Sequence, residues 1–209
     1  MNDKYEFNVK KKRPEEIYRN ASEYFKGQVL SQYAKSKSIM HIQEKITIRA
    51  LELLDLKDKS ALFLDAGCGP GFASIYLKEL GYEVVALDLI TEFLSYYDIK
   101  ELNPIRSDMC LPPFRSNTFN AIISISALQW IYSEITDKVM ESNLINMVKS
   151  FHIILKPNAK AIFQFYPKNN IIMENIGKII ADNTEFTGNF IIDNLDNPKK
   201  RKIFLLLQK

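Results

Sequence analysis

Cysteine is scarce in this sequence. The 209 residues include only two cysteines, Cys68 and Cys110, and these do not form a Cys-x-x-Cys pair. Two cysteines are too few for a disulfide framework or for a structural zinc site. We therefore expect two reduced thiols, no bound metal and an intracellular protein.

Long apolar runs and a strong excess of one charge are missing as well. No stretch of 18 or more apolar residues occurs, so the sequence predicts no membrane span. The polar start, Met1–Tyr5, does not resemble a signal peptide, which indicates a cytoplasmic location, and a nuclear one as well in a eukaryote. The formal net charge of +3 is too small to mark a nucleic-acid-binding protein by itself. Two basic runs, residues 10–13 and 199–202, are either solvated ends or phosphate-binding segments.

The chain does contain enough apolar residues, 46%, for one full core, so we expect one domain over residues 1–209. Residues 1–14 predict a flexible arm, residues 15–56 N-terminal helices and residues 61–207 a Rossmann-like core. The core alternates strands with helices, which indicates an α/β fold, a doubly wound sheet with helices on both faces. Two closing strands, one of them antiparallel, favour a seven-stranded, mostly parallel sheet over the six-stranded parallel dinucleotide fold. The expected helices span residues 15–25, 39–56, 72–80, 91–97, 140–155 and 171–182, and the expected strands residues 61–64, 82–87, 103–106, 119–125, 159–165, 190–193 and 202–207.

A glycine-rich turn, Leu-Asp-Ala-Gly-Cys-Gly-Pro-Gly, follows the first strand of this core at residues 64–71. Glycine allows a tight turn and a close approach of the backbone to a ligand. The spacing Gly67-x-Gly69-x-Gly71 differs from the Gly-x-Gly-x-x-Gly of dinucleotide sites, and Asp65 stands where a carboxylate can bind a methionine ammonium group. The turn therefore predicts an S-adenosylmethionine site. A nicotinamide-type site and a tight turn without a ligand are the alternatives.

Two further acids end the next two strands. Asp88 is placed to accept hydrogen bonds from ribose hydroxyls, and Asp108, followed by Met109, is placed to meet the adenine. The alternatives are a helix cap for Asp88 and a turn residue for Asp108. The full predicted cofactor-binding set is Asp65, Gly67, Cys68, Gly69, Gly71, Asp88, Leu89, Asp108, Met109 and Ser124.

The acceptor side is predicted from the segments after the fourth and fifth strands. These segments lie where an open α/β sheet binds its ligands, and they supply the predicted substrate-binding residues Gln129, Trp130, Tyr166 and Pro167. Trp130 and Tyr166 are expected to stack on a flat base, with core packing as the alternative, and Phe165 is expected in the core. His41 and His152 fall in helical runs and are expected to be structural.

Several motifs together resemble one family, the small-subunit ribosomal RNA guanine-N7 methyltransferases, which have a class I, Rossmann-like methyltransferase fold. The resemblance covers about residues 30–207. Its specific part is Ser-Ile-Ser-Ala-Leu-Gln-Trp at residues 124–130, because the glycine motif occurs throughout class I methyltransferases. The other matching segments are Ile42-Gln43, Arg49–Leu54, Leu64–Gly69, Pro113–Arg115, Thr118-Phe119, Gln164–Pro167, Gly188 and Lys199–Leu207.

The resemblance implies an enzyme that uses S-adenosylmethionine to methylate a guanine in small-subunit rRNA during ribosome maturation. It also implies a heterodimer with a small zinc-ribbon activator subunit. The chain departs from eukaryotic members in Ser107-Asp108-Met109-Cys110, where they have Gly-Asp-Met-Gly, and at Gly188, where they pair two glycines. It also ends at Lys209, without their basic C-terminal extension, which predicts an archaeal or shortened member.

The third strand is the expected docking edge for a partner. Apolar residues gather around it, and an unpaired edge with apolar neighbours promotes association unless it is covered. Pro104 blunting the edge is the alternative. The residues in question are Tyr96, Tyr97, Ile99, Leu102 and Ile105.

Guanine N7 carries an in-plane lone pair, so we nominate no general base. Catalysis then depends on holding the reacting atoms in line. Two other functions remain open. One is a methyltransferase acting on a small quinone or carboxylate, which would need inserted helices beyond the fourth or fifth strand, where the connections look short. The other is a ribosome-assembly scaffold that keeps the cofactor fold.

Overall fold

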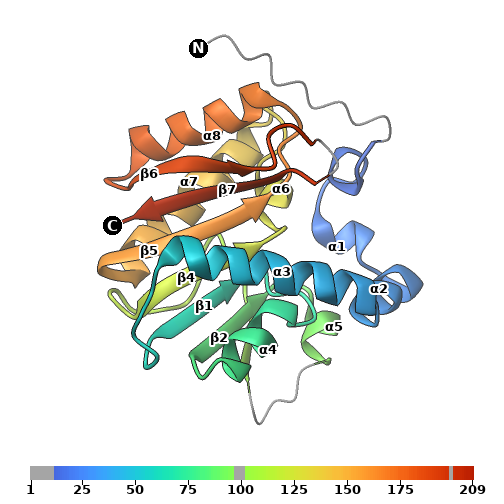
Figure 1. Ribbon diagram of the computed structural model, residues 1–209. Coiled ribbons are helices and arrows are strands. Elements are labelled where there is room, and N and C mark those ends of the chain that lie inside the picture. The colour runs from blue at the N-terminus through green and yellow to red at the C-terminus, as the bar shows by residue number, and fades with distance from the viewer. Residues whose placement is uncertain (1–11, 97–101, 198–199) are drawn as a thin grey trace.

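Seven strands form a single mixed sheet in the order β3-β2-β1-β4-β5-β7-β6 (Figure 1). The computed structural model describes residues 12–96, 102–197 and 200–209. Each neighbouring pair from β3 to β5 is parallel, whereas β7 runs antiparallel to both β5 and β6. The expected seven-stranded, mostly parallel sheet is confirmed. The strands are β1 Leu62–Ala66, β2 Glu83–Asp88, β3 Asn103–Arg106, β4 Phe119–Ile125, β5 Leu155–Phe165, β6 Thr187–Asp193 and β7 Lys202–Gln208.

Helices cover both faces of the sheet, with α3 and α4 on one side and α7 and α8 on the other (Figure 1). Successive residues of a strand point to opposite faces, so Phe63 packs in the apolar cluster under α3 and α4 and Leu64 in the one under α7 and α8. This double burial explains why the strands are continuous apolar runs. The helices are α1 Ala21–Tyr24, α2 Gly27–Ala34, α3 Lys37–Leu54, α4 Phe72–Glu79, α5 Thr91–Leu94, α6 Leu128–Ile131, α7 Lys138–Ile154 and α8 Asn170–Asn183.

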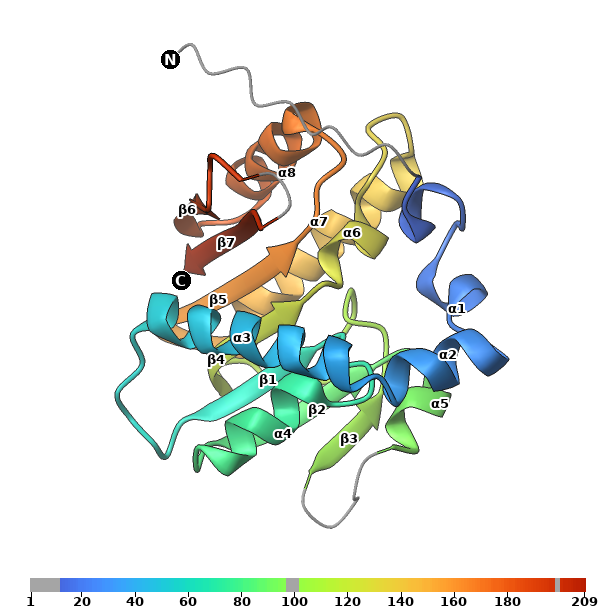
Figure 2. The ribbon, with the colours of Figure 1, turned by 45° about the vertical axis from the view of Figure 1, so that its right-hand side comes forward.

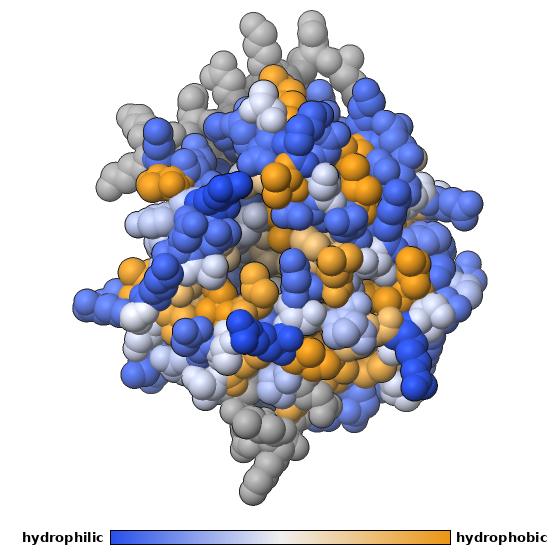
Figure 3. All heavy atoms as spheres, turned by 180° about the vertical axis from the view of Figure 1, so that it is seen from behind, coloured by the Kyte–Doolittle hydropathy of each residue, from blue (hydrophilic) through white to orange (hydrophobic). Residues whose placement is uncertain are grey.

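The side of the molecule that faces away from α3 and α4 shows hydrophilic and apolar side chains together (Figure 3). On the outer surfaces of α7 and α8, Val139, Ile153 and Ile171 are each more than half exposed. Single exposed apolar residues of this kind are ordinary on a protein surface.

The helix expected at residues 39–56 is α3, but its buried face differs from the expected one. The buried residues are Gln43, Ile46, Thr47, Ala50 and Leu54, while Ile42, expected on the apolar face, is 46% exposed. Two polar residues therefore enter the interior. Thr47 satisfies its hydroxyl by donating to the Gln43 carbonyl oxygen at 2.9 Å, and Gln43 reaches a cavity described below.

The N-terminal segment is more broken than expected. In place of one helix from residue 15 to 25, a single 3-10 turn at Pro14–Glu16 precedes α1 and α2. The Asn20 side chain accepts from the Glu23 amide and starts a new helix at that point. Residues 1–11 of the expected flexible arm, and with them the first two lysines of the basic run 10–13, lie outside the described residues, as does Lys199.

Three elements beyond β4 also differ from expectation, the first being β6, which begins at Thr187 rather than at residue 190. The strand expected at residues 159–165 begins earlier, at Leu155. Residues 156–158, expected as a loop, are part of β5. The short α6 was not predicted, since four residues are too few to show a helical period.

Candidate functional site

The glycine-rich turn lies between β1 and α4, at the carboxyl ends of the parallel strands. The amides of Gly67 and Cys68 both donate to the Leu87 carbonyl oxygen, at 2.8 and 3.0 Å, and tie the turn to β2. Gly67 has φ +74°, and a Cβ placed there would lie 2.6 Å from the Ala127 Cβ. The segment after β4 therefore packs against the turn so closely that only glycine fits.

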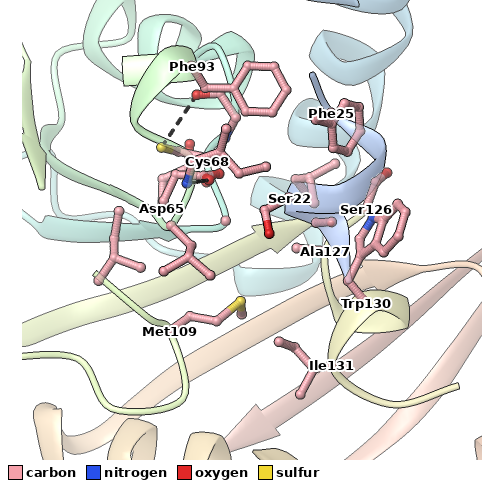
Figure 4. Close-up of a pocket in the computed structure, with 18 of the residues that line it drawn as sticks. Ser22, Phe25, Asp65, Cys68, Phe93, Met109, Ser126, Ala127, Trp130 and Ile131 are labelled. Carbon is pink, nitrogen blue, oxygen red and sulfur yellow. Dashed lines mark hydrogen bonds between the residues drawn. The ribbon is translucent and has the colours of Figure 1, made fainter. Parts of the chain in front are cut away.

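A cavity of about 210 Å³ opens beside this turn (Figure 4). Most of the predicted cofactor-binding residues line it, namely Asp65, Gly67, Cys68, Gly69, Asp88, Leu89, Asp108 and Met109. The structure places Gly71 and Ser124 outside the lining. Gly71 is the N-cap residue that precedes α4, and Ser124 is fully buried, where its hydroxyl donates to the Ala66 carbonyl oxygen at 2.7 Å.

Asp65 is 1% exposed and accepts a hydrogen bond from the Ser74 hydroxyl at 2.6 Å. Burial, and to a smaller extent the charge of Asp88, raise the pKa of Asp65 to about 7. Unfolding restores a pKa near 4, so between pH ~4 and ~7 the folded chain retains a proton that the unfolded chain releases, and the free protein loses stability as the pH rises through this window. A bound ammonium group would reverse this by stabilising the carboxylate.

Asp88 uses both carboxylate oxygens to hold the backbone. Oδ2 accepts from the Gly69 amide and Oδ1 from the Ile90 amide, each at 2.8 Å. Burial raises the pKa of Asp88, and these backbone hydrogen bonds oppose the rise. Each oxygen keeps a lone pair, which suits a ribose diol. The predicted helix cap is not formed, because α5 has no side-chain cap.

Asp108 lines the cavity and is exposed, and Met109 beside it comes close to the turn, with its Sδ 3.6 Å from a Cβ built on Gly67. Its Oδ1 accepts from the Cys110 amide at 2.8 Å, which is the local geometry of a turn residue. The turn interpretation and the cofactor interpretation are therefore compatible, because the carboxylate still faces the cavity.

The predicted acceptor residues separate into two groups. Trp130 lines the cavity, where its ring lies 5.9 Å from the rings of Tyr24 and Phe25. Gln129, Tyr166 and Pro167 do not line it. Gln129 and Pro167 are buried, and Gln129 Nε2 donates to the Ser126 carbonyl oxygen at 2.8 Å.

Tyr166 was expected to stack on a base, but cations lie over its ring instead. The guanidinium carbon of Arg13 is 5.8 Å from the ring centroid and Lys202 Nζ is 5.4 Å from it. Arg13 Nη1 also donates to the Tyr166 carbonyl oxygen at 2.6 Å. Phe165 is fully buried, as expected.

The cavity also has a wall that the sequence interpretation missed. Residues 20–34, here called the N-terminal roof, contribute Asn20, Ala21, Ser22, Phe25 and Tyr33 to the lining. Figure 2 shows α2 of the roof beside α5 and α1 next to α2, and Figure 4 shows Phe25 and Trp130 across the cavity from Asp65 and Met109. The unusual density of aromatic residues between positions 18 and 33 was the available signal, but their spacing follows no helical period.

Comparison with known proteins places this geometry in a family. The chain is 32% identical over 93% of its length to the 18S rRNA (guanine-N(7))-methyltransferase of Schizosaccharomyces pombe, of which it covers 72%. It is also 32% identical over 93% of its length to the Bos taurus 18S rRNA (guanine-N(7))-methyltransferase, of which it covers 68%. The chain belongs to this methyltransferase family. The family expected from the sequence motifs is confirmed.

Two further comparisons agree with this membership. Residues 64–163 match the methyltransferase-domain family. The TehB-like SAM-dependent methyltransferase of Corynebacterium glutamicum shares the fold, with a TM-score of 0.64 at 17% identity over 86% of this chain and 97% of that one. The protein is therefore an S-adenosylmethionine-dependent methyltransferase with a class I fold.

S-adenosylmethionine fits the residues that the cavity presents. The space beside Gly69 is open, with no atom within 4 Å of a Cβ built there, and the lining includes a buried acid, Asp65, which suits a ligand that carries an ammonium group. Within the described parts of the chain, no three His, Cys, Asp or Glu residues gather into a metal site, and no helix is long and apolar enough to cross a membrane.

Proposed function

We propose that this methyltransferase transfers the methyl group of S-adenosylmethionine to N7 of a guanine in small-subunit ribosomal RNA. The observation that carries the proposal is the match over 93% of the chain to proteins named as 18S rRNA guanine-N7 methyltransferases. The acceptor is taken from those names, and the cavity supports it. Work on ribosomal RNA would place the protein in the cytoplasm, and in the nucleus as well in a eukaryotic cell.

Bound S-adenosylmethionine supplies an electrophilic methyl group on sulfur. In this proposal Asp65 holds the methionine ammonium, Asp88 the ribose hydroxyls, and Asp108 with Met109 the adenine. The described lining residues include no histidine. Guanine N7 needs none, because its lone pair is free to attack without loss of a proton, so positioning supplies most of the rate.

The guanine is proposed to enter between the N-terminal roof and the segment after β4. Phe25 and Trp130 present aromatic surface there, and Ser22 and Ser126 present hydroxyl groups from the two sides (Figure 4). Stacking on such rings is worth about 1–3 kcal/mol per base. The alternative acceptor, a small quinone or carboxylate, would not need a cavity that is open at its edge. It would need an inserted helical lid, and α6, which follows β4, is too short to be one.

The RNA backbone is proposed to lie across Arg13, Lys200 and Lys202. Phe165 at the end of β5 pairs with Ile203, so Lys202 lies at the same edge of the sheet as the cavity. Arg13 and Lys202, the two cations over the Tyr166 ring, are part of this set of basic residues, here called the basic rim. Such contacts to phosphate give affinity without sequence preference.

A small zinc-ribbon activator subunit is the proposed partner, docking on β3. This strand is at the edge of the sheet, pairing only with β2, as expected. Leu102 is buried in the core at 4% exposed, however, so it adds nothing to the surface, whereas Tyr96 is exposed and Ile105 partly so. Tyr97 and Ile99 lie outside the described residues.

A stable complex would bury about 1,600 Å² in total. We expect Ile105→Asp to abolish co-purification with the activator, while Asn189→Asp on the opposite edge strand leaves it intact. A protein that methylates rRNA fully without any partner would refute this part of the proposal.

The decisive test maps N7-methylguanine in small-subunit rRNA from cells with and without this protein. One modified guanine should vanish in its absence and return with the wild-type chain but not with Asp88→Ala. Unchanged methylation would refute the proposal. Rescue of growth without methylation by Asp88→Ala would instead favour the scaffold.

A further inference from the structure

We propose that Tyr33 binds the cofactor directly, donating its hydroxyl hydrogen to the carboxylate of the methionine moiety of S-adenosylmethionine. This inference rests on the proposed placement of that moiety beside Asp65. It assigns a cofactor contact to the N-terminal roof. The glycine motif and the strand-end acids do not predict a contact in that segment.

Aromatic neighbours hold Tyr33 over the glycine-rich turn. Its ring lies 6.1 Å from that of Phe72, the first residue after the turn, and 5.8 Å from that of Phe93 on α5. Phe25 of the roof is closer still, at 5.1 Å. The side chain is thus packed by Phe25 of the roof, by α4 and by α5 while it lines the cavity.

The hydroxyl oxygen of Tyr33 is anchored at the methionine end of the cavity. Gln43 Nε2 donates to it at 3.4 Å and also to Ser126 Oγ at 3.4 Å. Ser126 directly follows β4, the strand that pairs with β1. In an open α/β sheet the crevice at this change of strand order receives the ligand. Gln43 uses a lone pair of the Tyr33 oxygen, so the hydroxyl hydrogen remains available, and no described residue accepts it.

The cavity must neutralise a carboxylate without a cation, because no lysine or arginine is among its described lining residues. Most of the neutral donors there are already committed. Ser126 Oγ donates to Gln164 Oε1 at 2.9 Å, and Ser22 Oγ donates to Asn20 Oδ1 at 2.8 Å. The amides of Gly67 and Cys68 donate to the Leu87 carbonyl oxygen, and the amide of Gly69 donates to Asp88.

Two other lining side chains keep a donor. Asn143 comes from α7, on the opposite face of the sheet from α4, and Trp130 belongs to the acceptor side. Tyr33 is the one placed beside the turn. Burial, more than the charge of Asp88, raises the pKa of Tyr33 to about 12, so the hydroxyl keeps its hydrogen at neutral pH.

In this proposal the two charged groups of the methionine moiety each have a partner. Tyr33 donates a hydrogen bond to its carboxylate, and Asp65 accepts one from its ammonium group. A hydrogen bond to a charged group is about twice as strong as a neutral one. The carboxylate would therefore be recognised as a group, and a cofactor analogue that lacks it would lose this contact alone.

The test compares S-adenosylmethionine with decarboxylated S-adenosylmethionine by titration calorimetry, using the full chain and the variants Tyr33→Phe, Tyr24→Phe and Asn143→Ala. We expect Tyr33→Phe to weaken binding of S-adenosylmethionine about 10- to 100-fold and to leave binding of the decarboxylated analogue within about twofold. Tyr24→Phe, which removes a roof hydroxyl outside the cavity lining, should change neither affinity.

Three results would overturn the inference. Equal weakening of both ligands would show that the ring packs the site and the hydroxyl does not bind the carboxylate. Unchanged binding of both would remove Tyr33 from the site. Selective loss in Asn143→Ala would assign the carboxylate to α7. If the wild-type chain bound neither ligand, the proposed cofactor site itself would fail, which is a different outcome.

Discussion

Alanine substitutions at Gly67 and Gly69 should affect two different properties of the glycine-rich turn. One should mainly lower the stability of the fold, and the other should mainly lower the affinity for S-adenosylmethionine. Gly67 and Gly69 both have positive φ, +74° and +53°, so alanine costs about 1–2 kcal/mol at either position. At Gly67 the added Cβ would also lie 2.6 Å from the Ala127 Cβ, well inside ordinary contact, and overpacking of this kind costs about 1–3 kcal/mol. At Gly69 no atom lies within 4 Å.

Gly67→Ala should therefore lower the free energy of unfolding by about 2–5 kcal/mol, and Gly69→Ala by only about 1–2 kcal/mol. Affinity for S-adenosylmethionine should show the converse. A methyl group on Gly69 enters the space that the cofactor needs, so Gly69→Ala should weaken binding and Gly69→Val should abolish it in a folded protein.

Urea unfolding of the free protein and titration calorimetry measure the two effects separately. The reasoning about the turn fails if both alanine variants lose the same stability. The cofactor assignment fails if Gly69→Val binds S-adenosylmethionine as the wild-type chain does.

Further tests address the acids and the rim. Because the pKa of Asp65 is raised to about 7 in the free protein and ammonium binding needs its carboxylate, affinity should rise about tenfold from pH 6 to pH 8, and Asp65→Asn should flatten this dependence in calorimetry. Asp88→Ala should weaken cofactor binding by about 1.5–3 kcal/mol, and an unchanged affinity would exclude it from the site. Lys200→Ala with Lys202→Ala should weaken RNA binding uniformly across sequences and reduce its salt dependence, whereas Lys178→Ala on α8 should not. Equal salt dependence in all three proteins would contradict the proposed rim.

The parts of the fold that the sequence predicts best are those governed by neighbouring residues. The strands at residues 103–106 and 119–125 have the expected bounds. The second of them is a nearly continuous apolar run that is buried on both faces, which is the strand pattern that a sequence shows most plainly. Asp65 near the end of β1 and Asp88 at the end of β2 reach the cavity as expected, since parallel strands bring their carboxyl ends to one edge of the sheet.

The features that the sequence does not predict depend on contacts between residues far apart in the chain. Gln43 is buried because its amide joins Tyr33 to Ser126, residues ten positions and more than eighty positions away along the chain. Tyr166 lies outside the cavity because Arg13 and Lys202 cover its ring. No local pattern encodes either contact, since in each the partner comes from a distant element.

The aromatic packing of the roof has a kinetic consequence. Phe25 lies 5.1 Å from Phe93 on one wall of the cavity and 5.9 Å from Trp130 on the other, so the closed roof bridges both walls. Each such ring pair is worth about 0.5–1.5 kcal/mol beyond its buried area. Every round of methylation leaves S-adenosylhomocysteine, which has to be exchanged for fresh cofactor past these rings. We therefore expect the opening of residues 20–34, rather than the methyl transfer, to limit the turnover rate.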